Sequence, residues 1–169
     1  MINKNGLKSA LVTGFGAAVV SYIPLIKFLA PIFTGFIAGY LAVKLYLKAE
    51  NKREKIKVRY GFLIGWATAF FTAIFSLAIE TIFTYIFKSN DFTKNYSALR
   101  IQLAESFKDF PENSFQILDG MVYDIQNYGF SILYLLVASI NFLIFYSLFC
   151  SIGGVLSLNA HNLKTKETL

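Results

Sequence analysis

The sequence predicts an all-α integral membrane protein with four transmembrane helices in a single membrane domain, on three observations. Apolar residues gather in long blocks that short charged connections separate, and the mean hydropathy is +0.54. Charged residues make up 15% of the chain, whereas a soluble domain carries about 25%. The longest block, residues 61–87, holds one acidic residue, Glu80, and exceeds the roughly 20 residues that a helix needs to cross a bilayer.

The first two spans, at about residues 9–29 and 31–47, are predicted to form a hairpin. Pro24 and Pro31 bracket the turn, because proline disfavours a helical conformation at the residue before it. The first residues also resemble the start of a secretory signal peptide, but the apolar run continues past any small-residue cleavage site, which favours an uncleaved helix. A continuous bent helix is the alternative to the hairpin.

A basic loop at residues 48–59 precedes the third span, at about residues 61–87. Between Lys44 and Arg59 seven basic residues oppose two acidic ones, a net charge of +5. Loops of this kind stay on the cytoplasmic side of the membrane, so the charge predicts topology rather than binding of nucleic acid. The loop residues also suited to anionic lipid headgroups are Lys52, Arg53, Lys55, Lys57 and Arg59.

The third span has two unlike faces. Small and polar residues recur every three or four positions on one face, at Gly61, Gly65, Ala69, Thr72, Ser76, Glu80 and Thr84. Small residues let helix backbones approach closely inside a bilayer, so we expect this face to contact protein and the bulky opposite face to contact lipid. Across the first three spans, the glycines expected at helix contacts are Gly14, Gly35, Gly39, Gly61 and Gly65.

Residues 89–128 form an acidic outer segment, in which six acidic residues oppose three basic ones for a net charge of −3. Apolar residues keep helical spacing on both sides of Pro111, which predicts two short amphipathic helices. These helices lie on the membrane, cover the bundle or bind a partner. The fourth span, at about residues 130–158, and a tail at residues 159–169 follow. Four crossings put both termini in the cytoplasm.

Three polar residues at membrane depth are the candidates for chemistry. Glu80 lies in the outer half of the third span, and an ionisable residue inside a membrane is a functional hypothesis by default. Lys27 in the outer hairpin is its first candidate partner, and Asn141 in the fourth span is the second. Glu80 is either a protonatable or cation-binding group in a transport path, or a structural group that locks the bundle.

No pattern in the sequence predicts an enzyme, a cofactor or a metal site. Phosphate-binding glycine loops, hydrolase motifs and metal-spaced clusters of cysteine and histidine are all missing. Cys150 lies in an apolar run and His161 in the polar tail, so we expect a packed thiol and a solvated imidazole rather than a nucleophile and its base.

These features together predict a small polytopic protein that acts by helix association in the lipid bilayer. It is expected to serve as an accessory or scaffolding subunit of a membrane complex, or to form a homo-oligomer. The alternative is a transporter or channel component that uses Glu80. The abundance of Lys, Asn, Ile and Phe indicates a bacterial source, and therefore a multi-pass protein of the cytoplasmic (inner) membrane.

Overall fold

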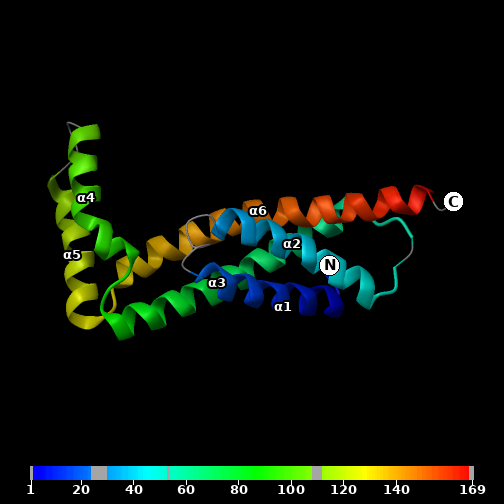
Figure 1. Ribbon diagram of the computed structural model, residues 1–169, viewed down its shortest axis with the longest axis horizontal. Helices are drawn as coiled ribbons and strands as arrows, with labels where there is room; N and C mark the ends of the chain where they lie inside the picture. Colours follow the sequence, from blue (N-terminus) through cyan, green and yellow to red (C-terminus); the bar gives the residue numbers. More distant parts are fainter. Residues whose placement is uncertain (1, 24–29, 53, 108–111, 168–169) are drawn as a thin grey trace. The chain divides into compact units, whose positions relative to one another are not determined.

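The computed structural model describes residues 2–23, 30–52, 54–107 and 112–167. Within these residues the chain is all-helical and forms no strand (Figure 1). The six helices are α1 (Lys4–Ser21), α2 (Ala30–Ala49), α3 (Val58–Phe87), α4 (Asp91–Ser106), α5 (Glu112–Tyr128) and α6 (Ile132–Glu167). Three segments are long and apolar enough to cross a membrane, namely Ile32–Ala49, Val58–Phe87 and Ile132–Leu163. The fold is therefore that of a helical protein with three candidate membrane-spanning helices.

Helix α1 differs most from its predicted bounds. It begins at Lys4 rather than near residue 9, because the side chain of Asn3 caps it by accepting a hydrogen bond from the backbone N–H of Gly6 at 3.0 Å. It ends at Ser21 rather than at residue 29, since Pro24 disfavours helix at the residue before it. Its 18 residues are not among the three candidate spans. The predicted turn, with Pro24 and Lys27, lies outside the described residues.

The other helices lie close to their predicted positions but are longer. Helix α2 gains a residue or two at each end, and α3 begins three residues earlier than predicted, at Val58. Helix α6 runs to Glu167, well past the predicted end at residue 158, because residues 155–167 contain neither proline nor glycine.

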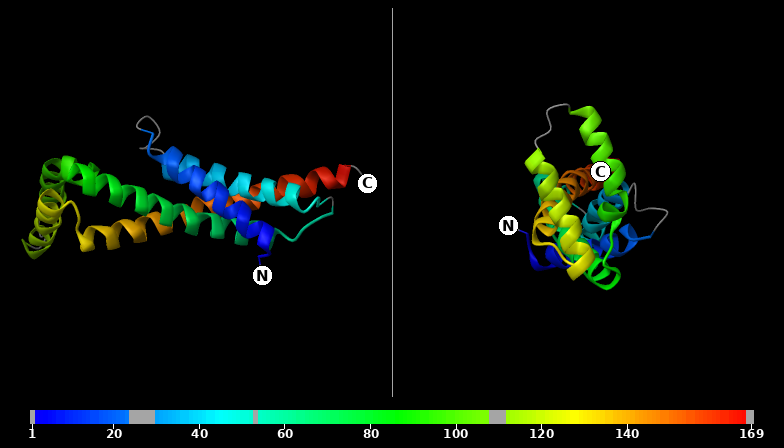
Figure 2. Two further views of the ribbon diagram at one scale, coloured as in Figure 1. Left: turned by 90° about the horizontal axis from the view of Figure 1, so that it is seen from below. Right: turned by 90° about the vertical axis from the view of Figure 1, so that its left-hand side faces the viewer.

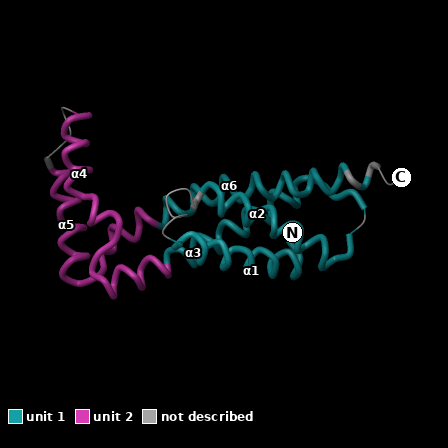
Figure 3. The backbone as a smooth tube through the Cα atoms, viewed as in Figure 1, with its two compact units in different colours: residues 1–77, 139–169 teal, residues 78–138 magenta. Residues whose placement is uncertain are grey.

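The chain divides into two compact units, which Figure 3 distinguishes by colour. Unit 1 comprises residues 1–77 and 139–169, and unit 2 comprises residues 78–138. Unit 1 thus contains α1, α2, most of α3 and most of α6. Unit 2 contains the last part of α3, all of α4 and α5, and the first part of α6.

Unit 1 is a bundle in which α1, α2 and the unit's portions of α3 and α6 run alongside one another (Figures 1 and 2). Its core is built from small side chains. One apolar cluster joins four alanines to Tyr146 and Cys150 of α6; the alanines are Ala17, Ala38, Ala69 and Ala73. A second cluster lies around Val43, Ile64 and Leu158, toward the end of the bundle that carries the basic loop.

Unit 2 is held by contacts between short helices. Asn90 caps α4, and its side chain and that of Thr93 form a reciprocal capping box. Helices α4 and α5 pack on each other. Met121 and Ile125 of α5 are buried.

Candidate functional site

The small and polar face of α3 is turned toward protein along its whole length. All seven of its residues, Gly61, Gly65, Ala69, Thr72, Ser76, Glu80 and Thr84, are buried. On the opposite face Trp66, Phe70 and Ile74 are exposed. The burial confirms that the first face contacts protein, and the exposure leaves the second face available to lipid.

Helices α2 and α3 approach α6 closely around Cys150. A Cβ atom added at Gly39 would lie 2.0 Å from the carbonyl oxygen of Cys150, and one added at Gly65 would lie 2.3 Å from the same oxygen. Farther along α6, a Cβ atom at Gly61 would lie 2.6 Å from the carbonyl oxygen of Gly154. Real Cβ atoms do not occupy such positions, so these contacts require glycine.

The two remaining predicted glycines make looser contacts. A Cβ atom at Gly14 of α1 would lie 2.9 Å from the Cβ of Phe71 and 3.1 Å from the carbonyl oxygen of Thr68, both on α3. At Gly35 of α2 the nearest atom, the Cβ of Phe149, is 3.3 Å away. The five glycines predicted from sequence therefore all face another helix of unit 1.

A cluster of buried hydroxyl groups joins the four helices of unit 1. Ser21 of α1 shares hydrogen bonds with Thr34 of α2 at 2.9 Å and with Tyr146 of α6 at 3.1 Å. Ser76 of α3 donates to the same Tyr146 oxygen at 3.4 Å. The hydroxyl of Tyr22 donates to the backbone carbonyl of Ser76 at 2.8 Å. Tyr146 is therefore the centre of a polar network that fixes the register of four helices.

Glu80 lies in unit 2, where its carboxylate is buried. The hydroxyl of Tyr134 of α6 donates a hydrogen bond to its Oε1 atom at 2.9 Å. The ring of Tyr134 stacks in turn on Phe92 of α4, with ring centroids 5.7 Å apart. One turn along α3 from Glu80, Thr84 accepts a hydrogen bond from the side chain of Asn90 at 3.5 Å. A neutral donor thus holds the carboxyl group of Glu80.

The two partners predicted for Glu80 are not tested. Lys27 lies outside the described residues. Asn141 belongs to unit 1, whereas Glu80 belongs to unit 2, so their pairing stays a prediction.

Both ends of the chain hold the basic loop in place. The side chain of Asn162 accepts from the backbone N–H of Ile56 at 3.0 Å and donates to its carbonyl at 2.8 Å. At the other end of the loop, Glu50 accepts from Asn3 at 2.9 Å and from Asn5 at 2.6 Å. The predicted headgroup residues Lys52, Lys55, Lys57 and Arg59 are exposed, and Arg53 lies outside the described residues.

Helices α4 and α5 expose part of their apolar surface, with Ile101, Ile117 and Tyr123 each more than half exposed. All residues of α4 are described, and none of them is buried. Tyr96 of α4 donates to Oδ1 of Asp119 of α5 at 2.5 Å, and Arg100 forms an ion pair with the same carboxylate at 3.7 Å. Burial, reinforced by this hydrogen bond to Asp119, raises the pKa of Tyr96 to about 12.

The sequence did not single out the hydroxyl cluster or Tyr134. Ser76 was placed on the small face of α3, but Ser21 and Thr34 stand among other small residues of apolar helices. Tyr146 is one of ten tyrosines, and only the packing of the four helices distinguishes it from tyrosines at the membrane interface.

The close glycine contacts and the buried hydroxyl cluster are suited to packing helices together. In the described part of the chain, no three histidine, cysteine, aspartate or glutamate residues come together as a metal site would require. Comparisons of the chain with known protein families, with curated proteins and with solved structures give no match.

Proposed function

We propose that the chain crosses the bacterial cytoplasmic membrane four times and serves as an accessory subunit of a membrane complex. In this proposal α1 is the first crossing, with both termini and the basic loop in the cytoplasm. Its 18 residues extend about 27 Å, close to the roughly 30 Å of the hydrocarbon layer. Its outward residues support this assignment, because Leu11, Val12 and Phe15 are exposed.

Thiol labelling tests this topology. Ser97→Cys on α4 and Lys57→Cys in the basic loop each introduce one exposed thiol, and the native Cys150 is fully buried. A reagent that cannot cross membranes should label Ser97→Cys in intact cells and label Lys57→Cys only after permeabilisation. Labelling of both positions from the same side would contradict four crossings.

The observation that carries the proposed association is that α4 has no buried residue. Its contact with α5 leaves every residue of α4 at least partly exposed, so the surface of this helix is open to a partner. Ile101 of α4 and Ile117 of α5 are each more than half exposed. Exposed apolar residues on two adjacent helices are typical of an interaction surface.

The charge of the outer segment favours a protein as the covering surface. With six acidic and three basic residues between 89 and 128, the segment carries a net charge of −3. Helices that lie on membranes are commonly rich in lysine and arginine, because these residues are attracted to anionic lipids. An acidic pair of helices gains nothing from such a surface. We therefore propose that α4 and α5 bind the outer part of another membrane protein.

Site-specific photocrosslinking tests this association in intact membranes. A photoreactive residue at Ile101 or Ile117 should give one discrete crosslinked product with a protein of different mass from this chain. The same residue at Ile74, on the exposed face of α3, is the control and should give none. A product with twice the chain's mass would indicate a homo-oligomer instead, and no product at Ile101 or Ile117 would refute partner binding.

A second candidate function is transport, and the buried carboxyl group of Glu80 favours it. Ionisable residues at membrane depth commonly mark ion or proton paths. The hydrogen bond from Tyr134 gives this carboxyl group a fixed position. Reconstituted vesicles should then show a proton or cation flux that Glu80→Gln abolishes and that Glu105→Gln, an exposed change on α4, preserves. Absence of flux with the unaltered chain would eliminate this candidate.

A further inference from the structure

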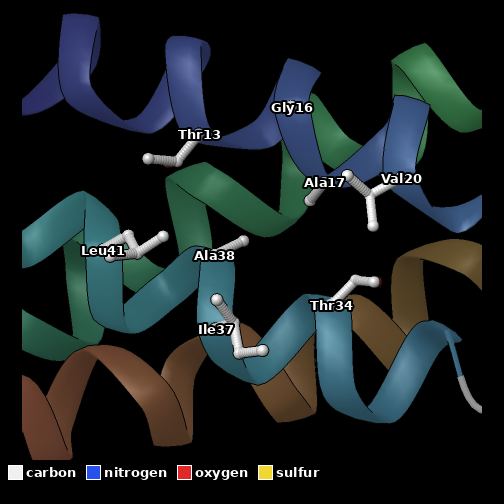
Figure 4. A pocket seen from close by; sticks show the side chains of 8 residues that line it. All are labelled: Thr13, Gly16, Ala17, Val20, Thr34, Ile37, Ala38 and Leu41. Carbon is white, nitrogen blue, oxygen red and sulfur yellow. The ribbon is translucent and has the colours of Figure 1, made fainter.

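Helices α1 and α2 enclose a groove with a volume of about 290 Å³. Its floor is formed by small residues, Ala17 of α1 and Ala38 of α2, which also belong to the apolar core of unit 1. Figure 4 shows the groove running between the two helices, with Thr13 and Leu41 at one end and Val20 and Thr34 at the other. The lining residues extend over eight positions of each helix, from Thr13 to Val20 and from Thr34 to Leu41, so the groove is about 10 Å long.

The groove is open, and its walls offer no unsatisfied polar group to a ligand. A Cβ atom added at Gly16 would meet nothing within 4 Å. The hydroxyl of Thr13 donates to the backbone carbonyl of Ser9 at 2.8 Å, and that of Thr34 is hydrogen-bonded to Ser21. The groove therefore fits an apolar chain rather than a polar molecule.

Two lysines continue the α2 side of the groove toward the basic loop. Lys44 and Lys48 follow Leu41 by three and seven residues, and both are exposed. They lie on the same side of the helix as Leu41, about 4.5 Å and about 10 Å farther along its axis. The ammonium group of Lys44 lies 4.8 Å from the centre of the Tyr40 ring, which holds it against α2.

The acidic residue nearest these lysines along the chain, Glu50, is held by residues that precede and begin α1. Glu50 accepts two hydrogen bonds, from the side-chain amides of Asn3 and Asn5. These donors draw its carboxylate toward the start of α1. Lys44 and Lys48 thus remain available to an anion at the end of an apolar groove.

We propose that an anionic phospholipid binds here, with one acyl chain between α1 and α2 and its phosphate at Lys44 and Lys48. A lysine side chain can lay its apolar stem along the helix and extend its ammonium group to the headgroups. The groove alone would not select a lipid, since acyl chains are equally apolar everywhere in the bilayer. Selectivity comes from the phosphate and the two lysines. The inference rests on the proposed membrane insertion and is independent of any partner on α4 and α5.

Native mass spectrometry of the full chain in detergent tests the lysines. Phosphatidylglycerol should bind in preference to phosphatidylcholine with the same acyl chains. The double change Lys44→Gln with Lys48→Gln should weaken its binding roughly 30-fold, from about 1 kcal/mol for each lysine. The comparison is Lys55→Gln with Lys57→Gln, which removes the same charge from two of the loop's predicted headgroup residues and should weaken binding less, because neither residue continues the groove. Equal weakening by both double variants would overturn the proposal in favour of general attraction to a basic surface.

A second pair of variants tests the groove itself. Gly16→Leu places a side chain in the open space and should weaken phosphatidylglycerol binding at least tenfold while the helical content is unchanged. Gly120→Leu is the matched control, because its Cβ position is equally free of neighbours and lies on α5. Unchanged binding by Gly16→Leu would overturn the proposal, as would equal competition from glycerol phosphate, which has no acyl chain. Failure of the chain to insert would appear separately, as altered thiol labelling of Lys57→Cys.

Discussion

The two units of the molecule are stabilised in different ways. In unit 1, helix backbones meet directly through glycines such as Gly39 and Gly65, and neutral hydroxyl groups link the four helices at Tyr146. In unit 2, Gly129 likewise lies close to the backbone of Tyr85, but a hydrogen bond between the side chains of Tyr134 and Glu80 takes the place of the hydroxyl cluster. Close packing leaves unit 1 little capacity to rearrange, whereas the exposed apolar residues of unit 2 are available to a partner.

The difference also explains which small residues are available for association. The glycines predicted at helix contacts are occupied by helices of the same chain, as where Gly61 meets Gly154. The open glycines are Gly16, in the groove of unit 1, and Gly120, in α5 of unit 2. Small residues therefore hold the helices of unit 1 to one another, and the proposed partner binds unit 2.

The largest effect should come from adding one carbon atom at a packed glycine. Gly39→Ala puts a Cβ atom 2.0 Å from the backbone oxygen of Cys150, and no side-chain rotation can relieve that contact. We expect a loss of about 2–3 kcal/mol in the free energy of unfolding, at the upper end of overpacking effects. Unfolding of the detergent-solubilised protein by sodium dodecyl sulfate measures this loss.

Gly120→Ala makes the same chemical change in unit 2 with no neighbour within 4 Å. It should stabilise α5 by about 0.5–1 kcal/mol, because glycine inside a helix is less favourable than alanine. Equal effects of the two changes would show that the close contacts around Cys150 do not stabilise unit 1.

The sequence was sufficient for the helical fold and for the faces of α3. Glycines spaced by four residues, a block of apolar residues and a basic loop are local patterns, and each depends on helix geometry alone. The predicted end of α1 was wrong because the apolar run continues past Pro24, whereas the helix ends three residues before this proline.

The networks around Tyr146 and Glu80 depended on information that sequence patterns lack. Ser21 and Tyr146 are 125 positions apart, and their contact follows from the packing of α1 on α6. Tyr134 likewise meets Glu80 from 54 positions away. The neutral phenol of Tyr134 was not predicted, because an acidic residue at membrane depth suggests a charged partner. Lys27 lies outside the described residues, so its pairing with Glu80 stays a prediction.

Removing a single tyrosine hydroxyl should lower the free energy of unfolding by a smaller amount in either unit. Tyr134→Phe removes the donor to Glu80 in unit 2, and Tyr146→Phe removes the shared partner of Ser21 and Ser76 in unit 1. Hydrogen bonds between membrane helices average about 0.6 kcal/mol and reach about 1.7 kcal/mol. We expect both Tyr134→Phe and Tyr146→Phe to lie within this range.

A double-mutant cycle in the same unfolding assay checks the assignment. Combining Tyr134→Phe with Glu80→Leu should give less than the sum of the two single effects, because each change removes the same hydrogen bond. Strict additivity would show that the Tyr134 hydroxyl does not stabilise Glu80. Tyr146→Phe combined with Glu80→Leu, which alters residues of different units, is the control for additivity.

The smallest effect is expected at the surface pair of unit 2. Burial and the hydrogen bond to Asp119 raise the pKa of Tyr96 from 10.0 to about 12, so folding favours the protonated phenol. This contribution to stability is present below pH 10 and is lost as the pH rises toward 12.

The ultraviolet absorbance of phenolate, taken as the difference between the unaltered chain and Tyr96→Phe, isolates this titration among the ten tyrosines. Asp119→Asn should lower the apparent pKa, because the acceptor loses its charge, whereas Asp124→Asn makes the same change on α5 and should leave it in place. If Asp124→Asn lowered the apparent pKa of Tyr96 as much as Asp119→Asn, the net negative charge of residues 89–128 would raise this pKa, and not the contact between α4 and α5.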